Sequence, residues 1–170
     1  MHNVEIESKY RIDNISKIKE KLEFLGAKNE GKHHWVDTYF ILPNNPEGKK
    51  YLRVREVDHK SELSYKLVES NTHKHEWETE VQSAEMAKGI IKQLGYEVDV
   101  IVDKERETHR YKNSEVVLDD VKNLGLFVEI ESPNVEEIEE IANELGFEKN
   151  QLVEDLGYPD LIRGGFRIST

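Results

Sequence analysis

Apolar and polar residues alternate along much of the chain, and this two-residue period predicts β-strands. In the first such segment, 4–12, the apolar residues fall broadly on one face. The opposite, charged face carries Glu5, Glu7, Lys9 and Arg11. Seven further segments have strand character, namely 35–41, 51–56, 62–68, 76–81, 100–110, 115–121 and 126–130. Short polar stretches separate several of them and suit antiparallel turns, such as the hairpin turn expected at 112–114.

Three other segments carry apolar residues every three to four positions, which predicts amphipathic helices. They span 15–25, 84–94 and 135–145, and a glycine follows each of them. Asp13 or Asn14 is suited to cap the first of these helices. A short segment near the C-terminus, 158–162, is expected to pack on the outside of the strands or over one end of them.

About eight antiparallel strands with helices inserted among them predict an α+β fold. Because so many strands carry a charged face, a closed or nearly closed barrel is favoured, since a barrel removes sheet edges and can enclose a polar lumen. The helices would then pack outside it. The chain has 170 residues and no linker rich in Pro, Gly or Ser, so we expect a single domain spanning 1–170.

Composition excludes several classes of function. The formal net charge of −11 argues against a general nucleic-acid or anionic-membrane binder, because both need a basic surface. The absence of cysteine excludes a disulfide framework and a thiolate metal site. Charged residues begin at Glu5, and no apolar run approaches the roughly 18 residues of a membrane span. A soluble, cytoplasmic protein is the expectation.

The charged faces together form an unusual set for one lumen. The acids on these faces are Glu5, Glu7, Glu78, Glu80, Asp119, Glu129 and Glu131. The bases are Lys9, Arg53, Arg55, Lys66, Lys104, Arg106 and Arg110. At such density each group needs a counterion, a ligand or a metal. Carboxylates favour Mg²⁺ or Mn²⁺, and arginines and lysines hold polyanions, a combination used in phosphoryl or nucleotidyl transfer.

The motifs and their order resemble the CYTH family over nearly the whole chain. They are Glu-Ile-Glu-Ser-Lys at 5–9, Asp-Thr-Tyr-Phe at 37–40, Leu-Arg-Val-Arg at 52–55, the strand of Lys66, Lys-Glu-Arg at 104–106, and the stretch 118–131. CYTH proteins comprise class IV adenylate cyclases, thiamine triphosphatases and inorganic triphosphatases. The resemblance implies their fold, a triphosphate tunnel of eight antiparallel strands.

The resemblance also implies roles for individual residues. Divalent metal would face Glu5, Glu7, Glu129 and Glu131, with Asp119 a further candidate. The triphosphate would be gripped by Lys9, Arg53, Arg55, Lys66, Lys104 and Arg106. Tyr39 and Lys104 would position or activate water in a triphosphatase, and Glu78, Glu80 and Arg110 would support the site. Many relatives carry an arginine just before the Glu-x-Glu of the strand expected at 76–81. This chain has His-Lys-His-Glu at 73–76 instead, so one anion contact is missing or replaced.

Several alternatives stay open at the level of sequence. Glu78 and Glu80 are as well explained by internal salt bridges as by direct ligation. Trp35 and Trp77 are expected to pack rather than to stack on a base. The paired histidines at 33–34 and 73–75 lack a third ligand at recognisable spacing and are expected at the surface.

Overall resemblance favours a class IV adenylate cyclase that converts ATP to cyclic AMP and pyrophosphate. The first alternative is a triphosphatase that releases orthophosphate from inorganic, thiamine or nucleoside triphosphate. The second is a non-catalytic binder of polyphosphate or nucleotide, which four added carboxylates would weaken. The sequence leaves open the group attached to the triphosphate, the physiological metal and the oligomeric state, a homodimer included.

Overall fold

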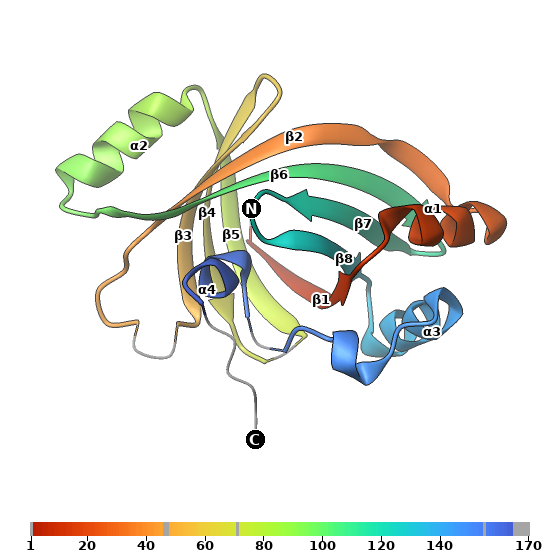
Figure 1. Cartoon of the computed structure of the whole chain (residues 1–170). Helices are drawn as coiled ribbons and strands as arrows, with labels where there is room; N and C mark the ends of the chain where they lie inside the picture. Colours follow the sequence, from red (N-terminus) through yellow and green to blue (C-terminus); the bar gives the residue numbers. More distant parts are fainter. Residues whose placement is uncertain (1, 46–47, 71, 155, 165–170) are drawn as a thin grey trace.

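The computed structural model describes residues 2–45, 48–70, 72–154 and 156–164, and its centre is a closed β-barrel (Figure 1). Its strands are β1 (His2–Ile12), β2 (Lys28–Phe40), β3 (Lys50–Val57), β4 (Lys60–Val68), β5 (His73–Val81), β6 (Val98–Tyr111), β7 (Ser114–Val121) and β8 (Gly125–Glu131). Around the barrel the order is β1-β5-β4-β3-β2-β6-β7-β8, every neighbouring pair is antiparallel, and β8 pairs with β1. The predicted α+β barrel is therefore confirmed.

Several strands are longer than the sequence pattern predicted. β2 begins at Lys28 rather than at Trp35, and β5 begins at His73 rather than at Glu76. Most residues of the early part of β2 are exposed, so no buried face imposes an alternation there. Pairing with β6 still extends the strand back to Lys28, which lies opposite Arg110. The register of this pairing shifts between Asn29 and Gly31.

The three predicted helices form at the predicted places. They are α1 (Ile15–Phe24), α2 (Ala84–Gln93) and α3 (Val135–Leu145). Each begins after a residue whose side-chain oxygen accepts from the backbone N–H three positions on, which satisfies one otherwise unpaired donor. These N-caps are Asn14, Ser83 and Asn134. Gly146 ends α3 in the left-handed conformation, with φ 75°, which glycine adopts without a steric penalty.

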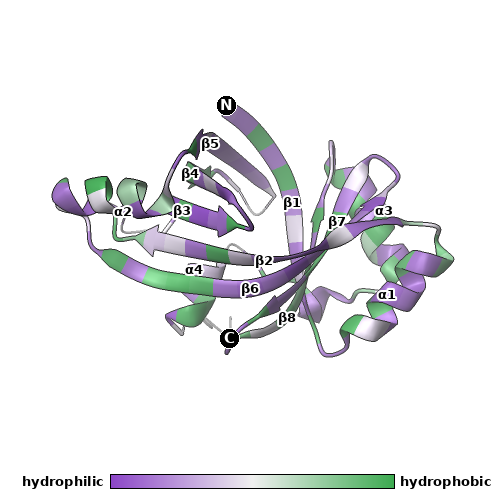
Figure 2. Cartoon of the chain, turned by 90° about the horizontal axis from the view of Figure 1, so that it is seen from above, coloured by the Kyte–Doolittle hydropathy of each residue, from purple (hydrophilic) through white to green (hydrophobic). Residues whose placement is uncertain are grey.

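The apolar faces of the strands are buried under the helices on the outside of the barrel. Figure 1 shows α1 and α3 together at one side and α2 at the other. One outer core combines residues of α1 and α3 with β1, β7 and β8, including Leu22, Val116, Val128, Ile130, Ile141 and Leu145. A second core lies under α2 and includes Phe40, Val54, Ala87 and Ile91. Figure 2 shows that hydrophilic and hydrophobic residues alternate along β1.

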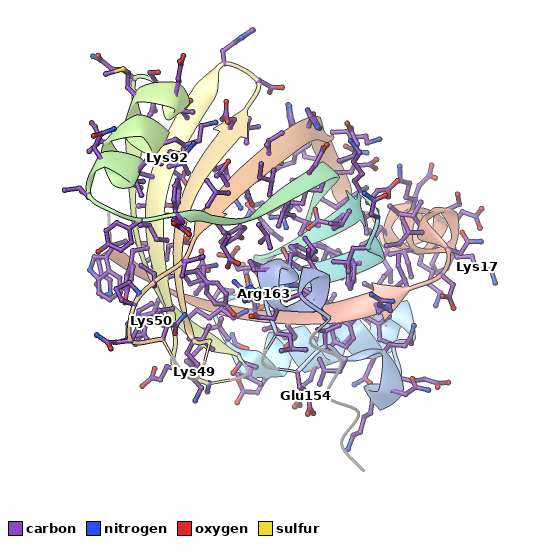
Figure 3. All side chains as sticks on the ribbon, turned by 60° about the vertical axis from the view of Figure 1, so that its left-hand side comes forward. Lys17, Lys49, Lys50, Lys92, Glu154 and Arg163 are labelled. Atoms are coloured by element: carbon purple, nitrogen blue, oxygen red, sulfur yellow. The ribbon has the colours of Figure 1, made fainter. Side chains whose placement is uncertain are left out.

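The C-terminal segment closes one end of the barrel. After a short 3-10 helix (Lys149–Gln151), the helix α4 (Tyr158–Ile162) packs Tyr158 and Leu161 against inward-facing residues of the strands. Tyr51 donates a hydrogen bond to Asp160, and Arg163, labelled in Figure 3, donates to Asp160 at 2.8 Å and also bonds Asp99 of β6. These polar contacts hold α4 over the lumen.

No helix in the described ranges has the length and apolar character needed to cross a membrane.

Candidate active site

The barrel encloses a cavity of about 210 Å³, lined by side chains from all eight strands and from α4. Because side chains alternate along a strand, every second residue points into the lumen. Most of the predicted site residues line this cavity: Glu5, Glu7, Lys9, Tyr39, Arg53, Arg55, Lys66, Lys104, Arg106, Glu129 and Glu131. The fold thus brings charged residues from both ends of the sequence into one space.

Two arginines of β3 are held in fixed positions by buried acids. Arg55 donates two hydrogen bonds to Asp37, at 2.7 and 2.8 Å, in the bidentate geometry that fixes a guanidinium most firmly. Arg53 donates to Ser64 and to Glu76, both at 3.0 Å. Burial alone would raise the pKa of Asp37, but Arg55 and Arg53 outweigh it and hold that pKa well below its usual range. The β3 arginines are therefore permanent, oriented cations.

A second cationic group lies on β6 and is anchored to Asp119. The Asp119 carboxylate is 0% exposed and accepts from Lys104 at 2.9 Å, from Arg106 Nε at 2.7 Å and from the hydroxyl of Tyr158 at 2.7 Å. Asp119 is not among the described residues that line the cavity. With its oxygens already occupied by these donors, it serves to orient the two bases.

Acidic residues gather on β1 and β8, and three of them meet a base. Glu5 accepts from Lys66 at 2.5 Å, Glu7 accepts from Lys74, and Glu129 lies 3.2 Å from Lys9. Arg106 also donates to Glu129, so one arginine links the β6 cations to this acidic side.

Three carboxylates lie side by side across neighbouring strands. Glu131 of β8 is directly opposite Glu7 of β1 on one side and Glu115 of β7 on the other. Burial raises the pKa of Glu131, and the negative charges of Glu7 and Glu115 raise it further. Like charges in register repel one another, so this row has an excess of negative charge that a bound cation would relieve.

The carboxylates of β1 and β8 suit a hard divalent cation, although they are not arranged around one. Within the described ranges, no group of three or more His, Asp or Glu side chains has the geometry to hold a metal ion. The reason is visible in the salt bridges, because Lys66 and Lys74 occupy the carboxylates of Glu5 and Glu7. Carboxylate oxygens without nitrogen or sulfur ligands match Mg²⁺ or Mn²⁺.

The lysines of the lumen differ in acidity. Burial and the charge of Arg106 lower the pKa of Lys104 to about 8, despite its contact with Asp119. Burial also opposes the charge of Lys66, but Glu7 and Glu5 outweigh it and hold the pKa of Lys66 above its ordinary value. Burial raises the pKa of Tyr39, which therefore stays a neutral phenol. Lys104 is the lysine best suited to exchange a proton.

The structure does not place Tyr39 and Lys104 in direct opposition. Lys104 is opposite Trp35 on β2, and Tyr39 lies four residues further along that strand, about 13 Å away at the strand rise. Tyr39 is opposite Arg53 and packs edge-on against Tyr51, with ring centroids 6.2 Å apart. Both side chains line the cavity, in different parts of the lumen.

Three predicted supporting residues lie away from the described cavity lining. Glu80 is exposed, Glu78 is half-buried, and the Arg110 side chain is 45% exposed and pairs with Glu115. Conversely, sequence reasoning missed Lys74 and Glu76, which face the lumen on β5. Counting back by twos from Glu78 would have found both. Lys74, two residues before Glu76, supplies a further lumen cation from β5.

Comparison with known proteins identifies the family. A family model described as the CYTH domain matches residues 3–156. The chain belongs to the CYTH family. A Methanocaldococcus jannaschii protein named "Putative adenylate cyclase MJ0240" is 30% identical in an alignment of 164 positions that covers 88% of this chain and 94% of that protein.

Solved structures share this CYTH fold. PH1012 from Pyrococcus horikoshii OT3 superimposes with a TM-score of 0.82 at 38% identity, over 92% of this chain and 98% of that one. HpAC1 from Hippeastrum, described as a "putative adenylyl cyclase" with a dominant triphosphatase activity, superimposes with a TM-score of 0.68 at 18% identity. That match covers 95% of this chain and 96% of HpAC1.

Proposed function

We propose that this CYTH protein is a divalent-metal-dependent enzyme that hydrolyses the terminal phosphate of a triphosphate chain held in the barrel lumen. The observation that carries the proposal is the convergence of seven basic side chains on one small cavity. They are Lys9, Arg53, Arg55, Lys66, Lys74, Lys104 and Arg106. Seven acidic side chains line the same cavity, so bases and acids converge there in equal number, as a site that binds a phosphate chain together with a divalent metal requires.

Hydrolysis is favoured over cyclisation by the size and composition of the cavity. Its volume of about 210 Å³ is below the roughly 300–1,000 Å³ typical of sites that enclose drug-sized ligands. Its described lining is dominated by charged side chains. The cavity therefore suits the phosphate chain itself better than a complete nucleotide.

Class IV adenylate cyclase activity is the second candidate. It is favoured by the name of the Methanocaldococcus jannaschii relative, which is 30% identical to this chain. Cyclisation would need room for a nucleoside beside the phosphate chain, with the ribose 3′-oxygen in line with the α-phosphorus. HpAC1, which shares the fold, has a dominant triphosphatase activity.

The residues of the lumen have three different roles in this reaction. Arg53, Arg55 and Arg106 bind the phosphate chain and stabilise charge that develops on the leaving phosphate. Lys104 accepts the proton of the attacking water, because its lowered pKa leaves part of the population neutral near pH 8. Glu5, Glu7, Glu129 and Glu131 are the residues that would hold Mg²⁺ or Mn²⁺. When bound, the metal would supply charge neutralisation at the phosphate oxygens.

Replacement of Lys104 by arginine distinguishes the role of Lys104 in proton transfer from the role of its positive charge. Lys104→Arg keeps a cation at this position but removes a group that can be neutral near pH 8, so we expect kcat to fall about a hundredfold with KM changed only a few-fold. Lys66→Arg is the matched control, because Lys66 stays charged and serves only to bind; it should chiefly alter KM. Equal effects of the two variants on kcat would contradict the assignment of Lys104.

Product analysis tests the reaction. Pure protein would be incubated separately with tripolyphosphate, ATP and thiamine triphosphate, each with Mg²⁺ or Mn²⁺. Orthophosphate is the expected product, with tripolyphosphate the best substrate. Cyclic AMP with pyrophosphate from ATP would establish the cyclase instead, and tight binding without any product would favour a binder.

A further inference from the structure

Trp35 lies inside the lumen, among the cations that we assign to the phosphate chain. Its ring is 4.3 Å from the guanidinium carbon of Arg55 and 4.9 Å from that of Arg106. These arginines come from β3 and β6, the two strands that pair with β2 on either side. Lys104, directly opposite Trp35, has its ammonium 5.5 Å from the same ring. The indole is thus the shared contact of three bases from two strands.

Packing alone does not account for this tryptophan. Trp35 belongs to none of the three apolar clusters formed by the described residues. Its indole Nε1 is buried and has no hydrogen-bond acceptor within the described part of the chain. A buried N–H without an acceptor destabilises the fold, because it has lost its hydrogen bond to water. An acceptor that arrives with a ligand would restore that bond.

We propose that Trp35 is a binding residue of the anion site: Nε1 donates a hydrogen bond to a phosphate oxygen, and the ring holds Arg55 and Arg106 on either side of the chain. This inference rests on the proposed function and extends it. The aromatic face attracts both guanidinium groups and keeps them spread. Every phosphate oxygen is an acceptor, so the neutral N–H adds a directed contact to the charged ones.

Two substitutions test the proposal by calorimetric titration with tripolyphosphate in the presence of a chelator, which removes turnover from the measurement. Trp35→Phe keeps an aromatic face and loses the N–H, and we expect the dissociation constant to rise about tenfold. Trp35→Leu loses both and should weaken binding further. Trp77→Phe is the matched control, because Trp77 is 43% exposed on the outside of β5 and stacks on His2 at 4.5 Å.

The fluorescence of Trp35 provides a second measurement. If Trp35 had only a structural role, tripolyphosphate would not change its emission. The chain contains two tryptophans, so Trp77→Phe leaves Trp35 as the sole indole emitter. Tripolyphosphate should shift or quench emission in that variant and leave the emission of Trp35→Phe unchanged. The measurement on Trp77→Phe keeps Trp35 intact, so it tests the proposal even if Trp35→Leu fails to fold.

The outcomes separate this inference from the proposed function. Failure of the wild-type protein both to bind tripolyphosphate in chelator and to hydrolyse it with Mg²⁺ or Mn²⁺ would overturn both. Wild-type binding together with an unchanged dissociation constant in Trp35→Phe, or with no emission change in Trp77→Phe, would overturn only the role of Trp35.

Discussion

Replacement of Glu5 and Glu7 together by glutamine should abolish turnover and strengthen the binding of tripolyphosphate in the absence of metal. Both effects follow from the same salt bridges. The two carboxylates are proposed metal ligands, and their loss removes several kcal/mol of transition-state stabilisation, or about 10³-fold or more in kcat. Their present partners, Lys66 and Lys74, would be released toward the phosphate chain, and the repulsion that the Glu7 carboxylate exerts on the chain would be gone.

Steady-state kinetics with Mg²⁺ or Mn²⁺ and calorimetry in chelator measure the two effects. The matched control is Glu78→Gln with Glu80→Gln, another Glu-x-Glu pair on a strand of the same barrel, whose side chains lie away from the described cavity lining. The control should retain kcat within a few-fold. Full activity in the Glu5 and Glu7 variant would refute the metal assignment, and weaker metal-free binding would refute the competition between these acids and the phosphate chain.

Asp119→Asn should lower the free energy of unfolding by about 3–5 kcal/mol, because it leaves two buried bases without their main counterion. Asp119 is 0% exposed and accepts from Lys104, Arg106 and Tyr158. At roughly 2–4 °C per kcal/mol for a chain of this size, the midpoint of thermal unfolding should fall by about 10 °C. Asp120→Asn, at the neighbouring exposed position on β7, is the control and should change the midpoint little.

The pH dependence of this loss has a definite sign. Arg106 and Lys104 hold the pKa of Asp119 below its ordinary value of 3.8, although burial opposes them. The contribution of the carboxylate to stability is therefore fully present above about pH 4 and is lost as the pH falls through the folded-state pKa. The difference between wild type and Asp119→Asn should shrink as the pH falls below about 4. A deficit that is unchanged in acid would show that packing, and not charge, is responsible.

The sequence predicted the barrel because one simple rule governs most of it. Alternation of charged and apolar residues identified all eight strands. The apolar period of three to four residues and the glycine after each helix set α1, α2 and α3 within a residue of their observed ends. The same rule oriented most lumen residues correctly. It failed where a strand is exposed on both faces, as in the early part of β2, since no alternation is then required.

Individual roles were harder to predict, because they depend on contacts between strands distant in the sequence. Asp119 has the same spacing as the other acids, but it lies among buried bases. It also accepts a hydrogen bond from Tyr158 at 2.7 Å. Tyr158 belongs to α4, and no sequence periodicity predicts where that helix packs. Asp37 was noted only as part of a motif, and its bidentate contact with Arg55 depends on the register of β2 against β3. Register is a property of the folded sheet that composition does not reveal.

The most direct test of the account is a crystal structure of the protein grown with tripolyphosphate and Mn²⁺, with the manganese located by anomalous scattering. We expect the phosphate chain inside the barrel, in contact with Arg53, Arg55 and Arg106, and manganese beside the carboxylates of Glu5, Glu7, Glu129 and Glu131. An empty lumen at saturating tripolyphosphate, or a phosphate chain bound only to the outer surface, would contradict the proposal that this cavity is the site of triphosphate chemistry.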